Sequence, residues 1–277
     1  ESMTNAPYLL KKHRSGARLG HDTTYDHMFL DGLEDAYEEG RAMGTFAQET
    51  ANDYQMTREE MDEYSIESLR RANAAIDSGA FADEVVPVTF STRKGEVTVE
   101  HDEQPGKGRP DKIPQLRPAF AKDGTITAAT SSSISDGAAA VVLSRESVAK
   151  ANGQQPVAKI VAMAAHAQEP AQFTVAPIGA IEKVLDKAGW SADEVELWEV
   201  NEAFACVAMF AMRDIGIPHD KINVNGGGTA LGHPIGASGT RIIVTLLNAL
   251  KQQGKKRGVA SLCIGGGEAT AVAVELV

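Results

Sequence analysis

The pattern of apolar and polar residues changes near residue 126, after which strand-like and helix-like segments alternate. Short apolar runs between turn residues are typical of buried strands, and longer runs with a 3.6-residue period are typical of helices. This alternation predicts an α/β fold, in which a mixed sheet carries helices on its faces. The predicted strands are 138–143, 157–165, 197–200, 222–224, 259–264 and 270–276, and the predicted helices are 177–187, 202–215 and the run that ends at residue 250.

The first half of the chain is more highly charged and is predicted to be mainly helical. Thr57 and Glu60 have the spacing of a capping box, and Gly79 is a typical helix stop, so we expect one long helix between them. The segments 84–90 and 96–100 are rich in β-branched residues and flank a short turn sequence. They predict a β-hairpin.

Composition narrows the class of protein. The chain has 277 residues, of which 43% are apolar, enough for one large domain or two modest ones. It contains neither an apolar run of membrane-spanning length nor a leader pattern, so we expect a cytoplasmic protein without a membrane partner. Its net charge of −11 argues against nucleic acid as a partner. The first residue is Glu1 rather than Met, which favours a fragment of a longer protein.

Two cysteines, Cys206 and Cys263, are too few for a disulfide framework and favour a reducing compartment. The histidines and cysteines show no metal-ligand spacing, so we expect no metal site. Lys and Arg residues gather in the loop 104–114. That loop is as well explained by a solvated connector as by a binding site for ligand phosphates.

The stretch 225–241, NGGGTALGHPIGASGTR, places six glycines around His233 and precedes an apolar helix. Glycine permits close backbone approach and positive φ, and a helix start presents unpaired N–H groups. This loop is therefore a candidate functional site. It lacks the Lys-Ser or Lys-Thr pair of a phosphate-binding Walker loop.

Three candidate residues lie where predicted elements end: Asn201 after a strand, His233 in the glycine loop, and Cys263 before three glycines. Such positions converge at one edge of an α/β sheet. Each also has an ordinary alternative role, because Asn201 would cap a helix well, His233 would suit any loop, and most free cysteines are simply buried. Cys206 has apolar neighbours and is expected in the core.

Together, the three residues favour acyl transfer, or proton abstraction beside a carbonyl group. A thiol beside the N–H groups of a glycine run can have its pKa lowered, which would make Cys263 a nucleophile or a base. A histidine can donate to a developing oxyanion or accept a proton, and an asparagine can hold a water molecule. A hydrolytic triad fits less well, since the chain has no Gly-x-Ser-x-Gly elbow.

The sequences NEAFA at 201–205, GGGTALGHPIGASGTR at 226–241 and CIGGGEA at 263–269 closely resemble three C-terminal signatures of the thiolases. The resemblance is greatest to the acetyl-CoA acetyltransferase branch and extends over the whole chain. It implies an acyltransferase that condenses two acetyl-CoA molecules, or cleaves a 3-ketoacyl-CoA, in fatty acid metabolism. It also implies coenzyme A thioesters as substrates, no permanently bound cofactor, and assembly into a dimer or homotetramer.

The resemblance further implies the layered αβαβα thiolase fold. Residues 1–133 would be a coenzyme A-binding loop domain with the end of an N-terminal strand. Residues 134–154 would be the last strand and helix of the N-terminal half, and 155–277 a complete C-terminal half. The N-terminal part that carries the nucleophilic cysteine would then be lacking, and this chain alone would be inactive. The alternative is a non-catalytic thiolase-like subunit that binds coenzyme A or acts as a scaffold.

Position by position, His233 resembles the histidine that activates the nucleophile and forms one oxyanion hole with a water held by Asn201. Cys263 resembles the acid/base cysteine, and the Gly265 N–H would serve a second oxyanion hole. The chain departs from the short-chain pattern at Ala42 and at Phe46, which would alter the acyl tunnel. Lys107 or Arg109 would replace a family arginine near the nucleotide. The matches to tunnel-lining positions are Leu33, Met43, Phe120, Ala128, Ser132, Ala203 and Phe204.

Overall fold

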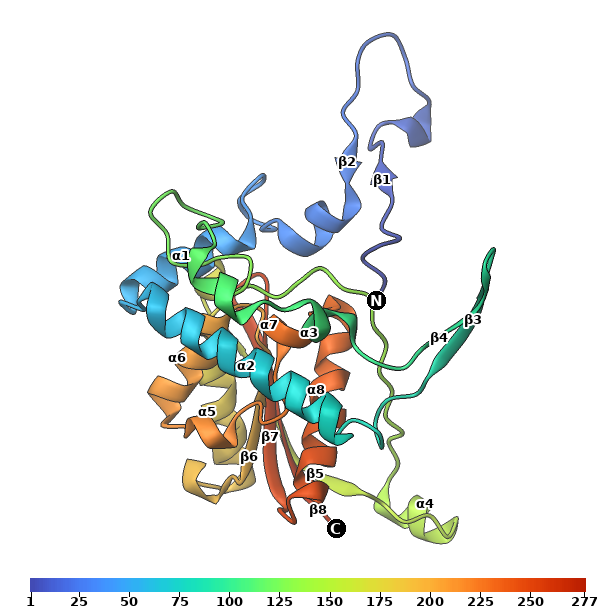
Figure 1. Ribbon diagram of the computed structural model, residues 1–277, viewed down its shortest axis with the longest axis vertical. Helices are drawn as coiled ribbons and strands as arrows, with labels where there is room; N and C mark the ends of the chain where they lie inside the picture. Colours follow the sequence, from blue (N-terminus) through green and yellow to red (C-terminus); the bar gives the residue numbers. More distant parts are fainter.

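A four-stranded sheet from the second half of the chain forms the centre of the computed structural model, which describes residues 1–277 (Figure 1). The strand order is β5-β8-β7-β6, with β6 parallel to β7 and β8 antiparallel to both of its neighbours. The predicted strand-turn-strand at the C-terminus is therefore confirmed as a hairpin. The strands are β5 (Ala158–Ala167), β6 (Leu197–Val200), β7 (Arg257–Ile264) and β8 (Glu268–Leu276).

Helices cover both faces of this sheet, as the alternating pattern predicts. On one face, α5 (Ala176–Ala188) and α6 (Ala205–Ile215) enclose the larger apolar core with Trp198 and Val200. On the other face, α8 (Ile235–Gln252) packs against a smaller core that includes Leu197. Neighbouring residues of β6 thus point to opposite cores, both of them buried. No helix is both long enough and apolar enough to cross a membrane.

The first half of the chain lies along one side of this unit and is built around a long helix. That helix, α2 (Arg58–Ser78), begins with the predicted capping box and ends at Gly79 with φ +74°. It packs against α6 and the short α7 (Gly228–Leu231), so it borders the glycine loop. The other helices here are η2 (Phe29–Leu33), α1 (Met43–Asp53), α3 (Glu103–Lys107) and the 3₁₀ helix η3 (Pro110–Gln115).

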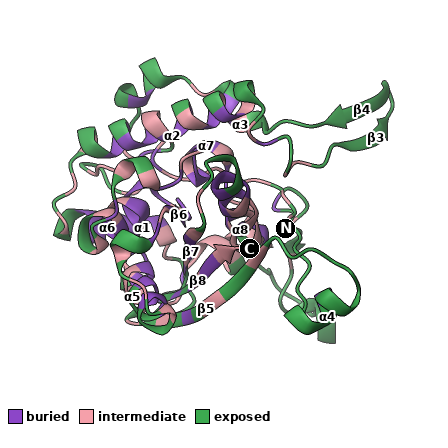
Figure 2. Cartoon of the chain, turned by 90° about the horizontal axis from the view of Figure 1, so that it is seen from below, coloured by how far each residue is buried: buried purple, intermediate pink, exposed green.

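Two hairpins project away from the body. The predicted second hairpin forms from β3 (Val88–Thr92) and β4 (Gly95–Val99), in register from Val88↔Val99 to Thr92↔Gly95. All of its residues are exposed (Figure 2). The other projection is an arm at the top of Figure 1, in which β1 (Tyr8–Leu9) pairs with β2 (Tyr25–Asp26) around a 3₁₀ helix, η1 (His13–Ser15). The sequence pattern did not predict this arm.

Two predicted strands do not form. Residues 138–143 are extended but pair with nothing, and Val142 and Leu143 are 95% and 72% exposed. The segment then leads to α4 (Glu146–Ala151). Residues 222–224 contribute a single bridge, from Ile222 to Trp198. An apolar run becomes a strand only where a neighbouring edge offers backbone partners, and neither run meets a full edge.

Candidate active site

Asn201 and His233 meet where β6 ends and the glycine loop passes over it. The backbone N–H of Asn201 donates to Ser261 O across 3.0 Å, which continues the parallel pairing of β6 with β7. Its side-chain Nδ2 lies 3.4 Å from His233 Nε2. The helix that follows begins only at Ala205 with Phe204 as its N-cap, so the alternative role of Asn201 as a helix cap is wrong.

Cys263 lies two residues beyond Ser261 on β7, next to the strand that delivers Asn201. Parallel neighbours end at the same edge of a sheet, so β6 and β7 deliver both residues to one region. The turn after Cys263 holds Gly266 and Gly267 at φ +91° and +86°, and Gly267 O accepts from the Gln168 N–H. The convergence expected for the three residues is thus present for Asn201 and His233 in direct contact, with Cys263 on the adjacent strand end.

Burial raises the pKa of the Cys263 thiol to about 12. This is the opposite of the expected lowering, because the loss of hydration outweighs the one opposing effect, a hydrogen bond with the backbone of Cys263 itself. Cys206 is fully buried in α6, and burial, followed by the nearby Cys263, also raises its pKa. Both cysteines are protonated thiols at neutral pH.

His233 is held from its other side by the first turn of α8. Its Nδ1 lies 2.5 Å from the hydroxyl oxygen of Ser238. Burial, and to a smaller extent the positive charge of Arg241, lowers the pKa of His233 to about 4. The imidazole is therefore neutral at neutral pH, as a group that accepts a proton must be.

A buried carboxylate, Glu202, links this region to α2 and was missed by the sequence analysis. It accepts hydrogen bonds from Tyr64 and Ser68 of α2, each at 2.8 Å. It also accepts from Asn223 Nδ2 at 2.8 Å, and from the backbone N–H and hydroxyl of Thr229 at 3.1 and 2.6 Å. A Cβ at Gly227 would lie 2.3 Å from its carboxyl carbon, which explains that glycine. The sequence feature that could have identified Glu202 is an acidic residue within the otherwise apolar stretch that follows a buried strand, the motif NEAFA at 201–205.

A cavity of about 390 Å³ opens between α2, α3, η3 and α7. Three cations, Lys107, Arg109 and Lys112, line it together with Ser65 and Thr229. The hydroxyl of Ser65 is buried and has no hydrogen-bond partner. Of the seven tunnel positions taken from the family resemblance, Ala128 lies in the wall of this cavity.

Five of the other six tunnel positions lie near Gly265 or the β6–α6 turn. Met43 Cε would lie 3.1 Å from a Cβ at Gly265. The Phe120 and Phe204 rings meet edge to face at 5.8 Å between centroids. The hydroxyl of Ser132 donates to Ala203 O at 2.9 Å, and Leu33 is half-buried at the end of η2.

The two departures from the short-chain pattern have different surroundings. Phe46 is 1% exposed in the main core, beneath the guanidinium of Arg41, and its effect on the tunnel stays a prediction. Ala42 is half-buried at the N-cap of α1.

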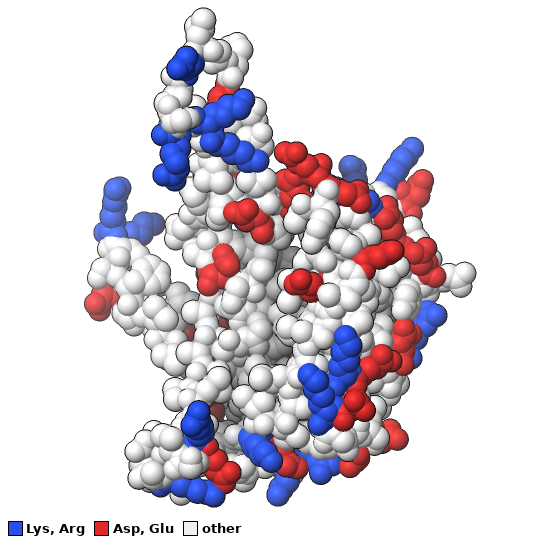
Figure 3. Space-filling view, turned by 180° about the vertical axis from the view of Figure 1, so that it is seen from behind, with Lys and Arg blue, Asp and Glu red and all other residues white.

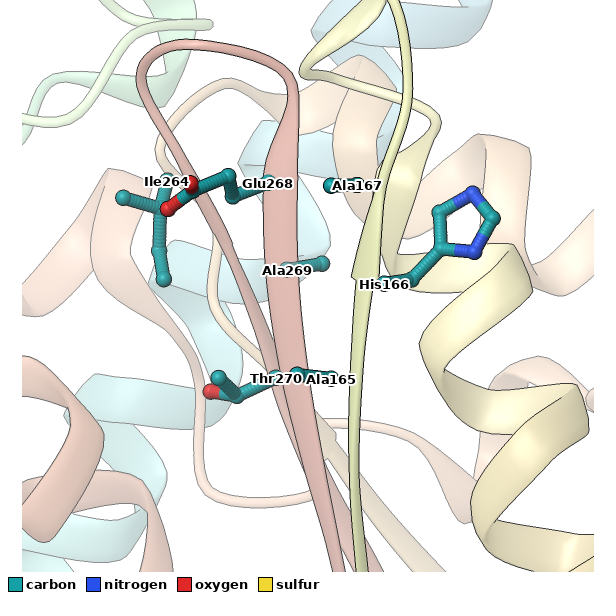
Figure 4. Close-up of a pocket in the computed structure, with 7 residues that line it drawn as sticks. All are labelled: Ala165, His166, Ala167, Ile264, Glu268, Ala269 and Thr270. Atoms are coloured by element: carbon teal, nitrogen blue, oxygen red, sulfur yellow. The ribbon is translucent and has the colours of Figure 1, made fainter.

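A second hollow, of about 270 Å³, lies over the β5–β8 edge of the sheet (Figure 4). It is lined by Ala165, His166, Ala167, Ile264, Glu268, Ala269 and Thr270. The His166 ring turns away from it, and its Nε2 lies 3.0 Å from Gln168 Oε1. No candidate catalytic residue faces this hollow.

Comparison with known proteins gives the family. Residues 154–276 match the model of the thiolase C-terminal domain, and residues 1–147 match that of the thiolase N-terminal domain. The chain belongs to the thiolase family. The prediction that the N-terminal part is lacking was wrong in that form, because residues 1–147 are themselves thiolase N-terminal-domain sequence.

Two curated relatives show the extent of the match between this thiolase chain and full-length proteins. An acetyl-CoA acetyltransferase from Yarrowia lipolytica is 47% identical over 100% of this chain and 68% of the relative. A probable acetyl-CoA acetyltransferase from Dictyostelium discoideum is 46% identical over 99% of this chain and 66% of the relative. The chain thus spans about two thirds of the length of these relatives.

Solved structures confirm the thiolase fold. The Bacillus anthracis acetyl-CoA acetyltransferase has a TM-score of 0.95 and 41% identity, over 100% of this chain and 70% of that one. The Ascaris suum Acat5 thiolase, solved with coenzyme A, has a TM-score of 0.88 and 38% identity over the same shares. Within the five-layered arrangement expected of the fold, these residues form one sheet with helices on both of its faces.

Proposed function

We propose that this thiolase chain contributes the acid–base half of an acetyl-CoA acetyltransferase, which condenses two acetyl-CoA molecules to acetoacetyl-CoA and free coenzyme A. The main support is the contact between Asn201 and His233 beside the end of the strand that carries Cys263. The names of the relatives, and the coenzyme A in one solved neighbour, support the same substrate class.

In the condensation, Cys263 acts in its thiolate form and takes a proton from the acetyl methyl group, which makes it a thiol, and the new carbanion attacks an acetyl thioester on a second thiol. That thiol leaves as the carbon–carbon bond forms. In the reverse direction, Cys263 returns its proton to the departing carbanion of acetyl-CoA. Burial raises the pKa of this thiol to about 12, so it is protonated at neutral pH and carries the proton that the reverse step needs. Bound thioester oxygens would be stabilised by the Gly265 N–H and by a water held on Asn201.

His233 takes the proton of the second thiol when that thiol attacks a thioester. A neutral imidazole is required for this step, and the low pKa of His233 provides it. Once protonated, the ring donates to the oxygen of the acyl group. Neither cysteine of this chain suits the acylated thiol, because Cys206 is fully buried in α6 and Cys263 has the acid/base role. We therefore propose that the acylated thiol is not among these 277 residues, and that the chain alone does not turn over.

Coenzyme A would enter the cavity beside α2. Lys107, Arg109 and Lys112 supply positive charge at its wall, where the phosphates of a polyanionic substrate need it. The domain boundaries at 133/134 and 154/155, the assembly into a dimer or tetramer, and a cytoplasmic location stay predictions.

Exchange of the acetyl methyl protons of acetyl-CoA with solvent deuterium tests the acid–base role without requiring the second thiol. We expect the chain to catalyse this exchange, Cys263→Ala to abolish it, and Cys206→Ala, a matched control in the core, to retain it. Mass spectrometry of the recovered acetyl-CoA measures the exchange. Binding of acetyl-CoA without exchange would favour the non-catalytic coenzyme A-binding subunit instead.

The same preparation tests the proposed need for an external thiol. We expect no loss of acetoacetyl-CoA when the chain is mixed with it and coenzyme A. Steady thiolysis by the purified chain would contradict this part of the proposal and leave the acid–base role intact.

A further inference from the structure

The two ring nitrogens of His233 face groups of opposite character. Nδ1 lies 2.5 Å from Ser238 Oγ, and Nε2 lies 3.4 Å from the amide nitrogen of Asn201. A neutral imidazole carries one proton, so one ring nitrogen donates and the other accepts. The neighbours of the ring therefore decide which nitrogen is basic.

With its hydroxyl hydrogen directed at Pro234 O, Ser238 accepts from His233. It is 1% exposed on the first turn of α8, and its hydroxyl donates to Pro234 O, four residues earlier, at 2.9 Å. This is the usual back-bond of a serine within a helix. A hydroxyl has a single hydrogen to donate, so its remaining lone pairs are what it offers to Nδ1. This arrangement favours a ring proton on Nδ1.

The other side of the ring leads to the same assignment. The amide nitrogen of Asn201 is a donor with no accepting capacity, so Nε2 presents a lone pair to it. Burial and the charge of Arg241 disfavour a second proton on the ring. An acceptor at Nδ1 and a donor at Nε2 thus select a single tautomer.

We propose that Ser238 is a positioning residue that holds His233 in the Nδ1-protonated tautomer, so that Nε2, beside Asn201, is the basic atom. The functional part of this inference rests on the proposed function, which gives His233 a proton to accept. The tautomer itself does not. In that reaction the proton arrives at Nε2, and Ser238 keeps accepting from Nδ1–H throughout, so the ring need not rotate or exchange protons between steps.

Long-range ¹H–¹⁵N NMR of chain labelled with ¹⁵N-histidine reads the tautomer directly, because protonated and bare ring nitrogens differ widely in ¹⁵N shift. The His233→Gln spectrum identifies the signals of His233 among those of the seven histidines. We expect Nδ1 to be protonated at pH 7 in the wild-type chain. A wild-type ring protonated at Nε2 would overturn the proposal, even if no variant folded.

Ser238→Ala removes the acceptor, and Ser238→Thr keeps it. We expect the ratio of tautomers to move about tenfold toward Nε2–H in Ser238→Ala, which is the usual effect of losing one hydrogen bond. It should stay unchanged in Ser238→Thr. Ser135→Ala is the control, since its hydroxyl lies in the same region and bonds only to Ser133. An unchanged ratio in folded Ser238→Ala would also overturn the proposal.

The acetyl-CoA exchange assay separates this inference from the proposed function. If the chain shows no exchange and His233 has the expected tautomer, the proposed function fails and the assignment of Ser238 stands. If exchange occurs and the tautomer is the opposite one, the assignment of Ser238 alone is overturned.

Discussion

Cys263 shows how its surroundings, more than its neighbours in sequence, set the protonation of a candidate catalytic group. The glycines that follow it are the feature that predicted an easily ionised thiol. The folded chain leaves the side chain 7% exposed within the main core, and the resulting loss of hydration raises its pKa to about 12. For this candidate residue the sequence predicted the opposite protonation state, because burial depends on segments distant along the chain.

Alkylation of Cys263 is therefore expected to be slow at neutral pH. The raised pKa leaves a thiolate fraction of about 10⁻⁵ at pH 7, against about 10⁻² for a thiol at the ordinary value of 9.0. The rate should rise about tenfold for each pH unit over the range in which the chain stays folded. Iodoacetamide labelling followed by peptide mass spectrometry measures it, with the urea-unfolded chain as reference. Labelling of the folded chain at the unfolded rate would contradict the burial of this thiol.

The helices illustrate which features the local sequence can determine. The ends of α2 were predicted because Thr57, Glu60 and Gly79 act on their own backbone neighbours. The docking of α2 was not predicted, because the donors to Glu202 come from Tyr64, Ser68, Asn223 and Thr229, which only the fold brings together. Local rules thus fix where a helix ends, and buried polar contacts fix what it touches.

Glu202→Gln should destabilise the chain by about 3 kcal/mol, because an amide nitrogen would replace one carboxylate oxygen among groups that all donate. Hydroxyls can rotate, but the Thr229 backbone N–H and the Asn223 amide cannot become acceptors there. Urea unfolding followed by circular dichroism measures the loss.

Glu199→Gln is the matched control. Glu199 is also buried, but burial raises its pKa to about 8, and its partner Arg241, at 3.3 Å, donates a hydrogen bond that the oxygen of glutamine still accepts. We expect Glu199→Gln to cost less than about 1 kcal/mol. Equal losses in the two variants would argue against the Glu202 network as the cause.

Charge is distributed unevenly over the molecule as a whole. The net charge is −11, yet Lys and Arg gather at the tip of the arm formed by residues 8–26 (Figure 3) and around the cavity beside α2. A polyanion approaching the molecule is repelled by most of the surface and attracted at these places. The segment 104–114, predicted as a loop, forms the short helices α3 and η3 instead, and it contributes Lys107, Arg109 and Lys112 to the cavity wall.

Replacing Lys107 and Arg109 together by alanine should weaken coenzyme A binding about tenfold and flatten its dependence on salt. Titration calorimetry between about 20 and 300 mM salt, which changes the screening length about fourfold, measures both effects. The double variant Lys251→Ala/Lys256→Ala, at the far end of α8, removes the same charge away from the cavity. An unchanged salt dependence in the first variant, or an equal change in the second, would contradict local recognition.

Sequence periodicity predicted most of the central sheet because its strands and helices have continuous apolar faces and clear stops. It failed at 138–143, whose apolar residues Val142 and Leu143 stay exposed for want of a strand partner. It also gave no indication of the arm around β1 and β2, which has few apolar contacts of its own. The ends of the strands predicted that Asn201 and Cys263 lie at one edge of the sheet. The contacts of the His233 ring with Asn201 and Ser238 depend on the fold and could not be predicted.

The anchoring of α2 through Glu202 also bears on how a ligand enters the cavity. On the inner side of the cavity, the buried carboxylate of Glu202 connects α2, the end of β6 and the glycine loop. These three parts are therefore expected to move as a rigid body. The outer wall consists of α3 and η3, which are short and are held to α2 by contacts such as Arg58 to Ile113 O at 2.9 Å. Motions that admit a substrate to the cavity should therefore be concentrated in residues 103–115. Substrate entry would then leave the contact between Asn201 and His233 undisturbed.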